Sequence, residues 1–171
     1  MTDTVIDAVT GEKLPDVGAE ANRQAVERLL LGEKGYAPSD IEVNMPLQVT
    51  VGGEPYRTVV DLVVRAKGVR FMAIKCAAGS LGSREREILA AARLLDSDHQ
   101  VPLAVVSDGR DAVVLDSVTG RKIGEGLSAV PTRSEAEMLL EQRTLQPFPE
   151  ERREKESLIF RSYDGMNVNR A

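Results

Sequence analysis

Hydrophobic and polar residues alternate strictly along residues 41–51. This predicts a half-buried β-strand that bends, or lies at a sheet edge, around Pro46. Glycine-containing turns separate this segment from two further apolar segments, at 56–64 and 69–76. Three consecutive strands joined by short turns predict an antiparallel meander.

Helical periodicity flanks this meander. Apolar residues recur every three or four positions in 20–31 and again in 84–95, which predicts two amphipathic helices. In the first of them, Arg23, Glu27 and Arg28 fall mostly on the face opposite the apolar one. The remaining expected elements are a fully apolar strand at 102–106, a strand at 112–115 and a helix at 132–143.

Two segments, 5–14 and 114–123, share the frame V-x-D-x-V-T-G-x-K-x. The first predicts a small hairpin near the N-terminus. Because the flanking sequences share nothing further, we interpret the frame as one strand-turn-strand solution used twice rather than as a repeated domain. Asp7 and Asp116 are then expected to be turn residues rather than ligands.

The end of the chain has a different composition. Residues 150–156 are almost all charged, which predicts a solvated helix that ends in a frayed segment at 165–171. Together, the elements predict an α/β fold with a mixed sheet: helix, three-strand antiparallel meander, helix and strand, with added hairpins. We expect one domain over 1–145 and a charged helical tail over 146–171.

Composition excludes several kinds of function. The 171 residues carry 22 basic and 27 acidic side chains, so a local basic groove fits better than nucleic-acid binding over the whole surface. The single cysteine, Cys76, and the single histidine, His99, exclude a disulfide scaffold and a Cys- or His-rich metal centre. We expect Cys76 to be a core thiol and His99 to be solvated. No apolar run approaches the roughly 20 residues that span a bilayer, and no signal peptide opens the sequence, so we expect a cytoplasmic protein without a membrane partner.

Two charged residues interrupt apolar strands. Asp61 lies within VVDLVV and Lys75 within FMAIKC. A buried charge is costly unless it is paired, so these side chains are expected to share one sheet face. They can form a structural ion pair. Alternatively, the carboxylate can be a metal ligand and the lysine can stabilise phosphate charge.

Several motifs, taken in order, resemble a known family: EANRQ at 20–24, Gly35-Tyr36, RTVVDLVV at 57–64, AIK at 73–75 and VVSDG at 105–109. Over roughly residues 18–115 the chain resembles the N-terminal domain of type I restriction enzyme R subunits. That domain has the restriction-endonuclease-like fold, also called PD-(D/E)xK. The resemblance implies partners among DNA or other proteins.

The resemblance also implies roles for individual residues. Glu20 matches an acidic residue of the opening helix, Asp61 matches the metal-binding aspartate, and Lys75 matches the lysine of the (D/E)-x-K triplet. Asp108-Gly109 matches a short turn after a later strand. The acidic position of the triplet, however, is Ala73. Because that acid and the aspartate jointly hold magnesium in the family, the resemblance implies at most weak Mg²⁺ binding here.

Three interpretations follow from Ala73. The domain can be a non-catalytic relative that acts as a nucleic-acid or protein interaction module, which we expect. A displaced carboxylate can restore a Mg²⁺-dependent DNA endonuclease, with Glu87 as the first candidate and Glu85 as the second. Lastly, Glu20 and Asp61 together can hold the metal weakly. The chain has no Walker motif for a helicase motor, so we expect a stand-alone protein or one with partners supplied in trans.

The segment 79–87, GSLGSRERE, leads from the Lys75 strand into the second helix. Its exposed N–H groups, with Arg84 and Arg86, can receive a nucleic-acid phosphate. The alternative is a helix capped by Ser83 with a solvated face of arginines and glutamates.

Overall fold

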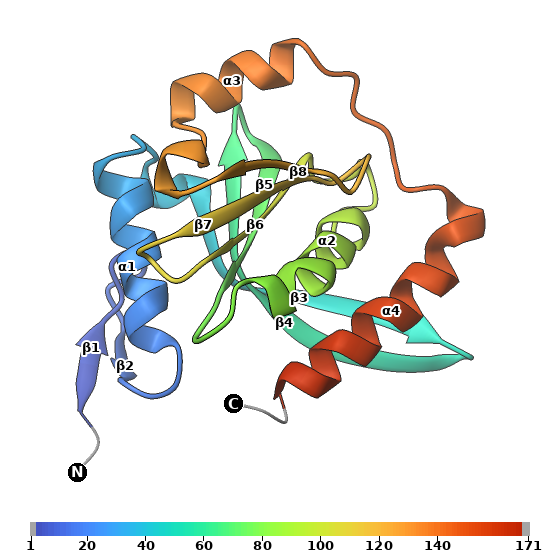
Figure 1. The fold of residues 1–171 in the computed structure, drawn as a ribbon, viewed down its shortest axis with the longest axis horizontal. Coiled ribbons are helices and arrows are strands. Elements are labelled where there is room, and N and C mark those ends of the chain that lie inside the picture. The colour runs from blue at the N-terminus through green and yellow to red at the C-terminus, as the bar shows by residue number, and fades with distance from the viewer. Residues whose placement is uncertain (1–2, 169–171) are drawn as a thin grey trace.

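The computed structural model describes residues 3–168, and their central element is a six-stranded mixed sheet (Figure 1). The strand order is β3-β4-β5-β6-β7-β8, in which β5 and β6 are parallel and every other neighbouring pair is antiparallel. This confirms the predicted mixed α/β fold with its meander. The strands are β3 (Ile41–Val51), β4 (Glu54–Ala66), β5 (Val69–Cys76), β6 (Leu103–Ser107), β7 (Ala112–Asp116) and β8 (Lys122–Glu125).

Helices cover both faces of the sheet. α2 (Glu85–Leu94) and α4 (Glu150–Val168) pack on one face, where Val63 and Ala73 point. α1 (Glu20–Gly32) and α3 (Arg133–Glu141) pack on the other face, which receives alternate residues of the same strands. None of the helices in the described part of the chain is both long and apolar enough to cross a membrane.

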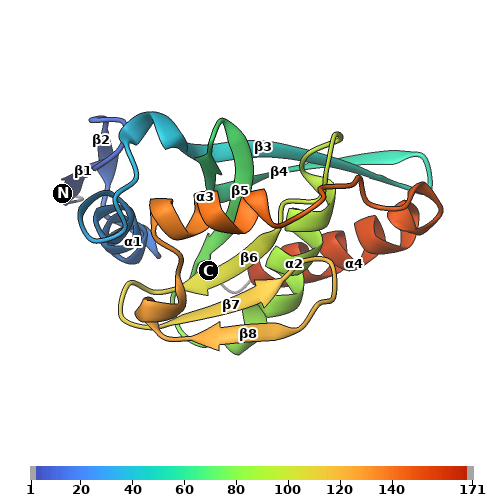
Figure 2. The same cartoon turned by 90° about the horizontal axis from the view of Figure 1, so that it is seen from above.

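The predicted hairpin forms from β1 (Thr4–Ile6) and β2 (Lys13–Pro15). It lies beside α1 at the end of the molecule opposite α4 (Figure 2). As predicted, Asp7 is a turn residue: its Oδ1 accepts the N–H groups of the residues two and three positions later, at 2.9 and 2.8 Å. Asp116 makes the same two bonds, at 2.9 and 3.1 Å. The repeated frame therefore encodes one local turn used twice.

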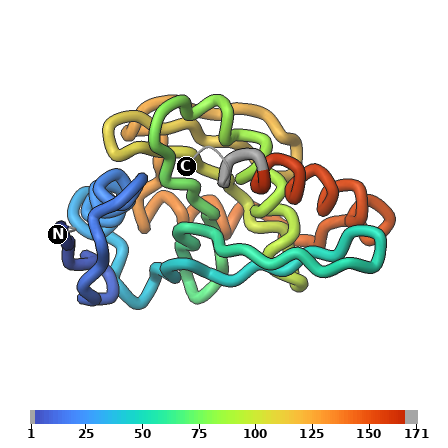
Figure 3. Tube along the Cα trace, turned by 90° about the horizontal axis from the view of Figure 1, so that it is seen from below, coloured from blue at the N-terminus to red at the C-terminus, as the bar shows by residue number. Residues whose placement is uncertain are grey.

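The C-terminal helix is docked through a few buried side chains, although most of 150–156 is exposed, as predicted. The frayed end is the part of the prediction that the structure corrects. α4 lies along α2 and beside the β3–β4 hairpin (Figure 3). Glu156, Phe160 and Asp164 are all buried. The helix continues to Val168, and residues 169–171 of the expected tail lie outside the described residues. A few buried positions anchor the helix, although its remaining surface is charged.

Candidate nuclease site

The two charges that interrupt the apolar strands do interact. In the antiparallel ladder of β4 and β5, Leu62 pairs with Ile74, so the preceding Asp61 lies on the same face as Lys75. The Lys75 Nζ lies 3.8 Å from Asp61 Oδ2. Each side chain is about a fifth exposed, at 23% and 21%, so solvent reaches both. The expected proximity is confirmed, while the chemical roles of both residues stay predictions.

Glu87 approaches the same lysine from the first turn of α2. Its Oε1 lies 3.7 Å from Lys75 Nζ, and its side chain is buried. Ala73 is also fully buried on this face, in the core between the sheet and α2. Helix α2 therefore brings a carboxylate to Lys75 on the face where β5 has the methyl group of Ala73 instead of an acid.

A backbone bond fixes the Asp61 carboxylate. The N–H of Cys76 donates to Asp61 Oδ2 at 2.8 Å, which leaves Oδ1 for another partner. The Cys76 thiol is buried in the core on the opposite face, as predicted. Burial, followed by the nearby Asp61 charge, raises the thiol's pKa well above its usual value. Cys76 is thus a neutral core thiol rather than a nucleophile.

Glu20 lies next to this group without joining it. Its Oε1 accepts hydrogen bonds from Arg23 Nη2 at 2.8 Å, Arg23 Nε at 3.2 Å and Gln24 Nε2 at 2.9 Å. Within residues 3–168, no ion pair joins Glu20 or Glu85 to Lys75. Glu20 and Asp61 nevertheless line one cavity of about 330 Å³. The structure therefore brings Asp61, Lys75 and Glu87 together, and Glu20 shares a cavity with Asp61 without pairing with Lys75.

The face of α1 opposite its apolar residues is only partly exposed: Arg28 is exposed, but Arg23 and Glu27 are buried. The N-terminal hairpin covers the two buried residues. Gln24 Nε2 lies 3.0 Å from Asp7 Oδ2 and 3.2 Å from Glu27 Oε2, and Arg23 lies within 4 Å of both carboxylates. Sequence periodicity identified the polar face but carries no signal for the hairpin that packs on it.

The two acids of this buried cluster, Glu27 and Asp7, have pKa values shifted in opposite directions. Burial, followed by a hydrogen bond to Asp7, raises the pKa of Glu27 to about 8. Burial also acts to raise the pKa of Asp7. The hydrogen bonds that Asp7 accepts outweigh burial and lower its pKa to about 2. The hydrogen bond with Glu27 contributes most, and the others come from the turn N–H groups and Gln24. The neutral Glu27 carboxyl therefore donates to the Asp7 carboxylate.

The predicted phosphate site at the start of α2 is only partly available. Arg86 is engaged in a two-pronged ion pair with Glu156, at 2.6 and 2.9 Å, which Arg93 joins at 3.1 Å. Ser83 does not cap the helix. Its hydroxyl donates to the Ser80 carbonyl oxygen, and the cap residue is Arg84. Among the described residues, Arg84 makes no ion pair, so it is the one arginine of this turn with a guanidinium open to a phosphate.

The Asp108-Gly109 turn has a packing role. Gly109 adopts φ +88°, and a Cβ added there would lie 2.5 Å from the Cβ of Ala25 on α1. Only glycine permits both the backbone conformation and this close approach. Asp108 Oδ1 accepts the N–H groups of the residues two and three positions later, at 2.8 and 2.9 Å. The motif thus fixes α1 against the sheet end that carries the candidate site.

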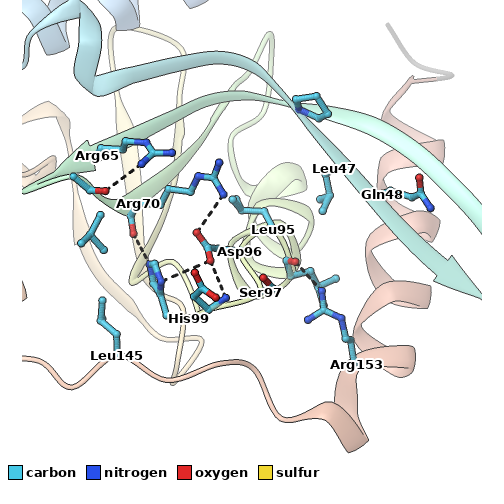
Figure 4. A pocket seen from close by; sticks show the side chains of 15 residues that line it. Leu47, Gln48, Arg65, Arg70, Leu95, Asp96, Ser97, His99, Leu145 and Arg153 are labelled. Atoms are coloured by element: carbon cyan, nitrogen blue, oxygen red, sulfur yellow. Dashed lines mark hydrogen bonds and ion pairs between the residues drawn. The ribbon is translucent and has the colours of Figure 1, made fainter.

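A second cavity, of about 630 Å³, contains none of the predicted site residues (Figure 4). Arg70 binds Asp96 at 3.2 Å, and a ring nitrogen of His99 lies 2.9 Å from the Arg70 carbonyl oxygen. His99 is only 9% exposed, which corrects its expected solvation. The polar groups here satisfy one another, which indicates a structural network.

The chain is a mixed α/β domain in which two acids and a lysine converge beside the central strands. A family model described as "Type I restriction enzyme R protein N terminus (HSDR_N)" matches residues 18–131, well over half of the chain. The chain therefore belongs to the family of type I restriction enzyme R protein N-terminal domains. No curated protein matches it, and no solved structure does.

Proposed function

We propose that this chain is a metal-dependent DNA endonuclease domain in which Glu87, on α2, replaces the acid that is missing at position 73. One observation carries the proposal: Lys75 Nζ lies between two carboxylates, 3.8 Å from Asp61 and 3.7 Å from Glu87. The two acids come from different elements and converge on one positive group. This is the expected arrangement if the carboxylate has moved from the strand to the helix.

The donor set suits magnesium. Mg²⁺ takes oxygen ligands and is commonly held by one or two carboxylates, with water and substrate phosphate oxygens completing its octahedron. Asp61 and Glu87 supply those two carboxylates. Within the described residues, no three His, Cys, Asp or Glu side chains are grouped to hold a metal, so water and phosphate would contribute the other ligands. When bound, the ion supplies charge neutralisation and an activated water.

The chain's own residues then have distinct tasks. Lys75 places its ammonium group beside the carboxylates, where it can neutralise developing charge on a phosphate oxygen. The Cys76 N–H holds Asp61 in place at 2.8 Å. Arg84, whose guanidinium makes no ion pair in the described part of the chain, is the group that we propose contacts the DNA backbone.

A second candidate function rests on Ala73 itself. The loss of the family's acid favours a non-catalytic DNA- or protein-interaction module with weak Mg²⁺ binding. Asp61, Lys75 and Glu87 are then a structural charge network between the interior strands β4 and β5 and helix α2. Both candidates are compatible with a cytoplasmic location, where the lone buried thiol of Cys76 would stay reduced.

Plasmid nicking in Mg²⁺ or Mn²⁺ separates the two candidates. The proposal predicts nicking by the wild type and a loss of at least about 100-fold in Asp61→Ala and in Glu87→Gln, because each removes a metal ligand. Glu85→Gln, on the same helix turn, is the matched control and should keep wild-type activity. An inactive wild type with cleavage gained only in Ala73→Glu would favour the non-catalytic module. Thermal unfolding of each variant checks that the fold is retained.

A further inference from the structure

A cavity of about 330 Å³ adjoins Asp61 at the end of the sheet, between the N-terminal hairpin and β3. One side is apolar and comes from β2 and the segment that leads into α1. The other side is polar and comes from α1 and the strands. The apolar side chains are Leu14, Pro15, Val17 and Ala19, and the polar side includes Glu20, Arg23, Asn44 and Asp61.

Arg23 holds two polar side chains at this cavity. Its Nε and Nη2 donate to Glu20 Oε1, and its Nη1 donates to Asn44 Oδ1 at 3.0 Å. Among the hydrogen bonds of residues 3–168, none engages the other carboxylate oxygen of Glu20 or the Asn44 amide N–H₂. Glu20 and Asn44 therefore contribute one acceptor and one donor, both on side chains held by a buried guanidinium, and Asp61 Oδ1 adds a further acceptor at the cavity.

Asn44 has an unusual backbone conformation for a strand residue. It has φ +53°, in the left-handed region, and it falls opposite Asp61, where the β3–β4 ladder lacks its regular pair. Asparagine tolerates this region better than most residues, and such conformations cluster at functional sites. The irregularity lets the Asn44 side chain reach Arg23 on α1 beside Asp61.

A nucleobase suits this cavity better than a phosphate does. The guanidinium of Arg23 is already paired with Glu20, so the carboxylates of Glu20 and Asp61 disfavour an anion, while the apolar side chains can cover a base. An acceptor with a donor complements the hydrogen-bonding edge of an unpaired base, which carries an amino or imino donor beside an acceptor. The positive charge that would attract the DNA backbone lies on Lys75, 3.8 Å from the Asp61 carboxylate.

We propose that this cavity binds one unpaired base of a DNA strand whose backbone lies at Asp61, Lys75 and Glu87. This inference rests on the proposed function and specifies its substrate as single-stranded or locally unpaired DNA. The apolar wall from Leu14 to Val17 precedes the family match, which begins at residue 18. The base-binding wall would thus come from β2 and the segment that leads into α1.

The test is fluorescence anisotropy of labelled oligonucleotides in Ca²⁺ or in EDTA, which reports binding without cleavage. Three probes of equal length are compared. A single strand and a strand of abasic residues carry the same backbone charge, and a blunt duplex, with about twice as many phosphates, shows what added backbone charge alone contributes. At about 25 cal/mol per Å² of apolar surface, burying about 40 Å² of a base against this aliphatic wall is worth about 5-fold in affinity. We therefore expect the single strand to bind at least about 5-fold tighter than the abasic strand.

Two variants probe the cavity. Asn44→Gly removes the amide while glycine accepts the positive φ, and Val17→Ser weakens the apolar wall. Both should reduce the preference for bases at least about 3-fold, because one removes a hydrogen-bond donor and the other removes apolar surface. Val118→Ser is the control, because Val118 is 59% exposed, Val17 is 60% exposed, and Val118 lines a different cavity.

Equal binding of the single and abasic strands, or variants that match the wild type, would overturn the base site. If the plasmid is still nicked in that case, the endonuclease proposal survives alone. Base discrimination without nicking would support the cavity and assign it to the non-catalytic module. Absence of binding to all three probes would overturn the base site and, if nicking also fails, the proposed DNA substrate.

Discussion

Two neighbouring residues of α2, Arg86 and Glu87, take part in ion pairs of different kinds. Arg86 meets Glu156 through hydrogen-bonded contacts of 2.6 and 2.9 Å that join α2 to α4. Glu87 and Asp61 lie 3.7 and 3.8 Å from Lys75, beyond hydrogen-bonding distance. The first geometry is that of a structural clamp. The second is a looser contact, and Lys75 and Asp61 are partly exposed, so a water or a phosphate oxygen can also reach them, as the proposed site requires.

Breaking the clamp should have the largest effect on stability. Glu156→Ala leaves Arg93, whose side chain is 8% exposed, and the partly buried Arg86 without their shared carboxylate. Removing one partner of a buried ion pair costs about 3–5 kcal/mol, so we expect a large fall in the midpoint of urea unfolding. The control is Glu154→Ala, which removes an exposed acid of the same helix. Equal stability of the two variants would show that the clamp is not structural.

The cluster between the hairpin and α1 is a second tightly bonded structural group, and it predicts a pH effect. The pKa of Glu27 is raised to about 8 in the folded chain, against 4.5 as its ordinary value. Between these values the folded state holds a proton that the unfolded state lacks. The free energy of unfolding should therefore fall as the pH rises from 4.5 to 8.

Glu27→Gln should remove that dependence, because a glutamine cannot ionise and can still donate to Asp7. Thermal unfolding between about pH 5 and pH 8 measures the slope for the wild type, Glu27→Gln and Glu12→Gln, in which an exposed acid of the hairpin is replaced. Identical slopes for wild type and Glu27→Gln would mean that Glu27 is ionised in the folded protein. The hairpin would then be held by charge rather than by a shared proton.

The smallest effect is expected at the site itself. Asp61→Asn keeps an oxygen to accept the Cys76 N–H and removes one charge from a partly exposed ion pair. Such pairs contribute about 0–1 kcal/mol, so the unfolding midpoint should barely change although nicking is lost. Loss of stability comparable to that of Glu156→Ala would place Asp61 among the structural pairs instead.

Local sequence signals predicted the sheet and singled out two residues of the candidate site, Asp61 and Lys75. Alternation and glycine turns encode the meander, and the cost of burying a charge singled out Asp61 and Lys75. Glu87 was a candidate because α2 follows the lysine strand, but its inward direction depends on how that helix packs. The hairpin over Arg23 and the docking of α4 through Glu156 join segments far apart in sequence. No local pattern specifies such contacts, so the sequence alone does not predict that Arg23 and Glu156 are buried.

The most direct test of the central claim is the Mg²⁺-dependent nicking rate of Ala73→Glu/Glu87→Gln compared with that of Glu87→Gln alone. If carboxylates at positions 73 and 87 can serve the same ion beside Lys75, the single variant should lose at least about 100-fold, and the carboxylate added at position 73 should restore much of the rate. A Glu87→Gln protein that nicks DNA as fast as the wild type would contradict the assignment of Glu87 as the displaced acid.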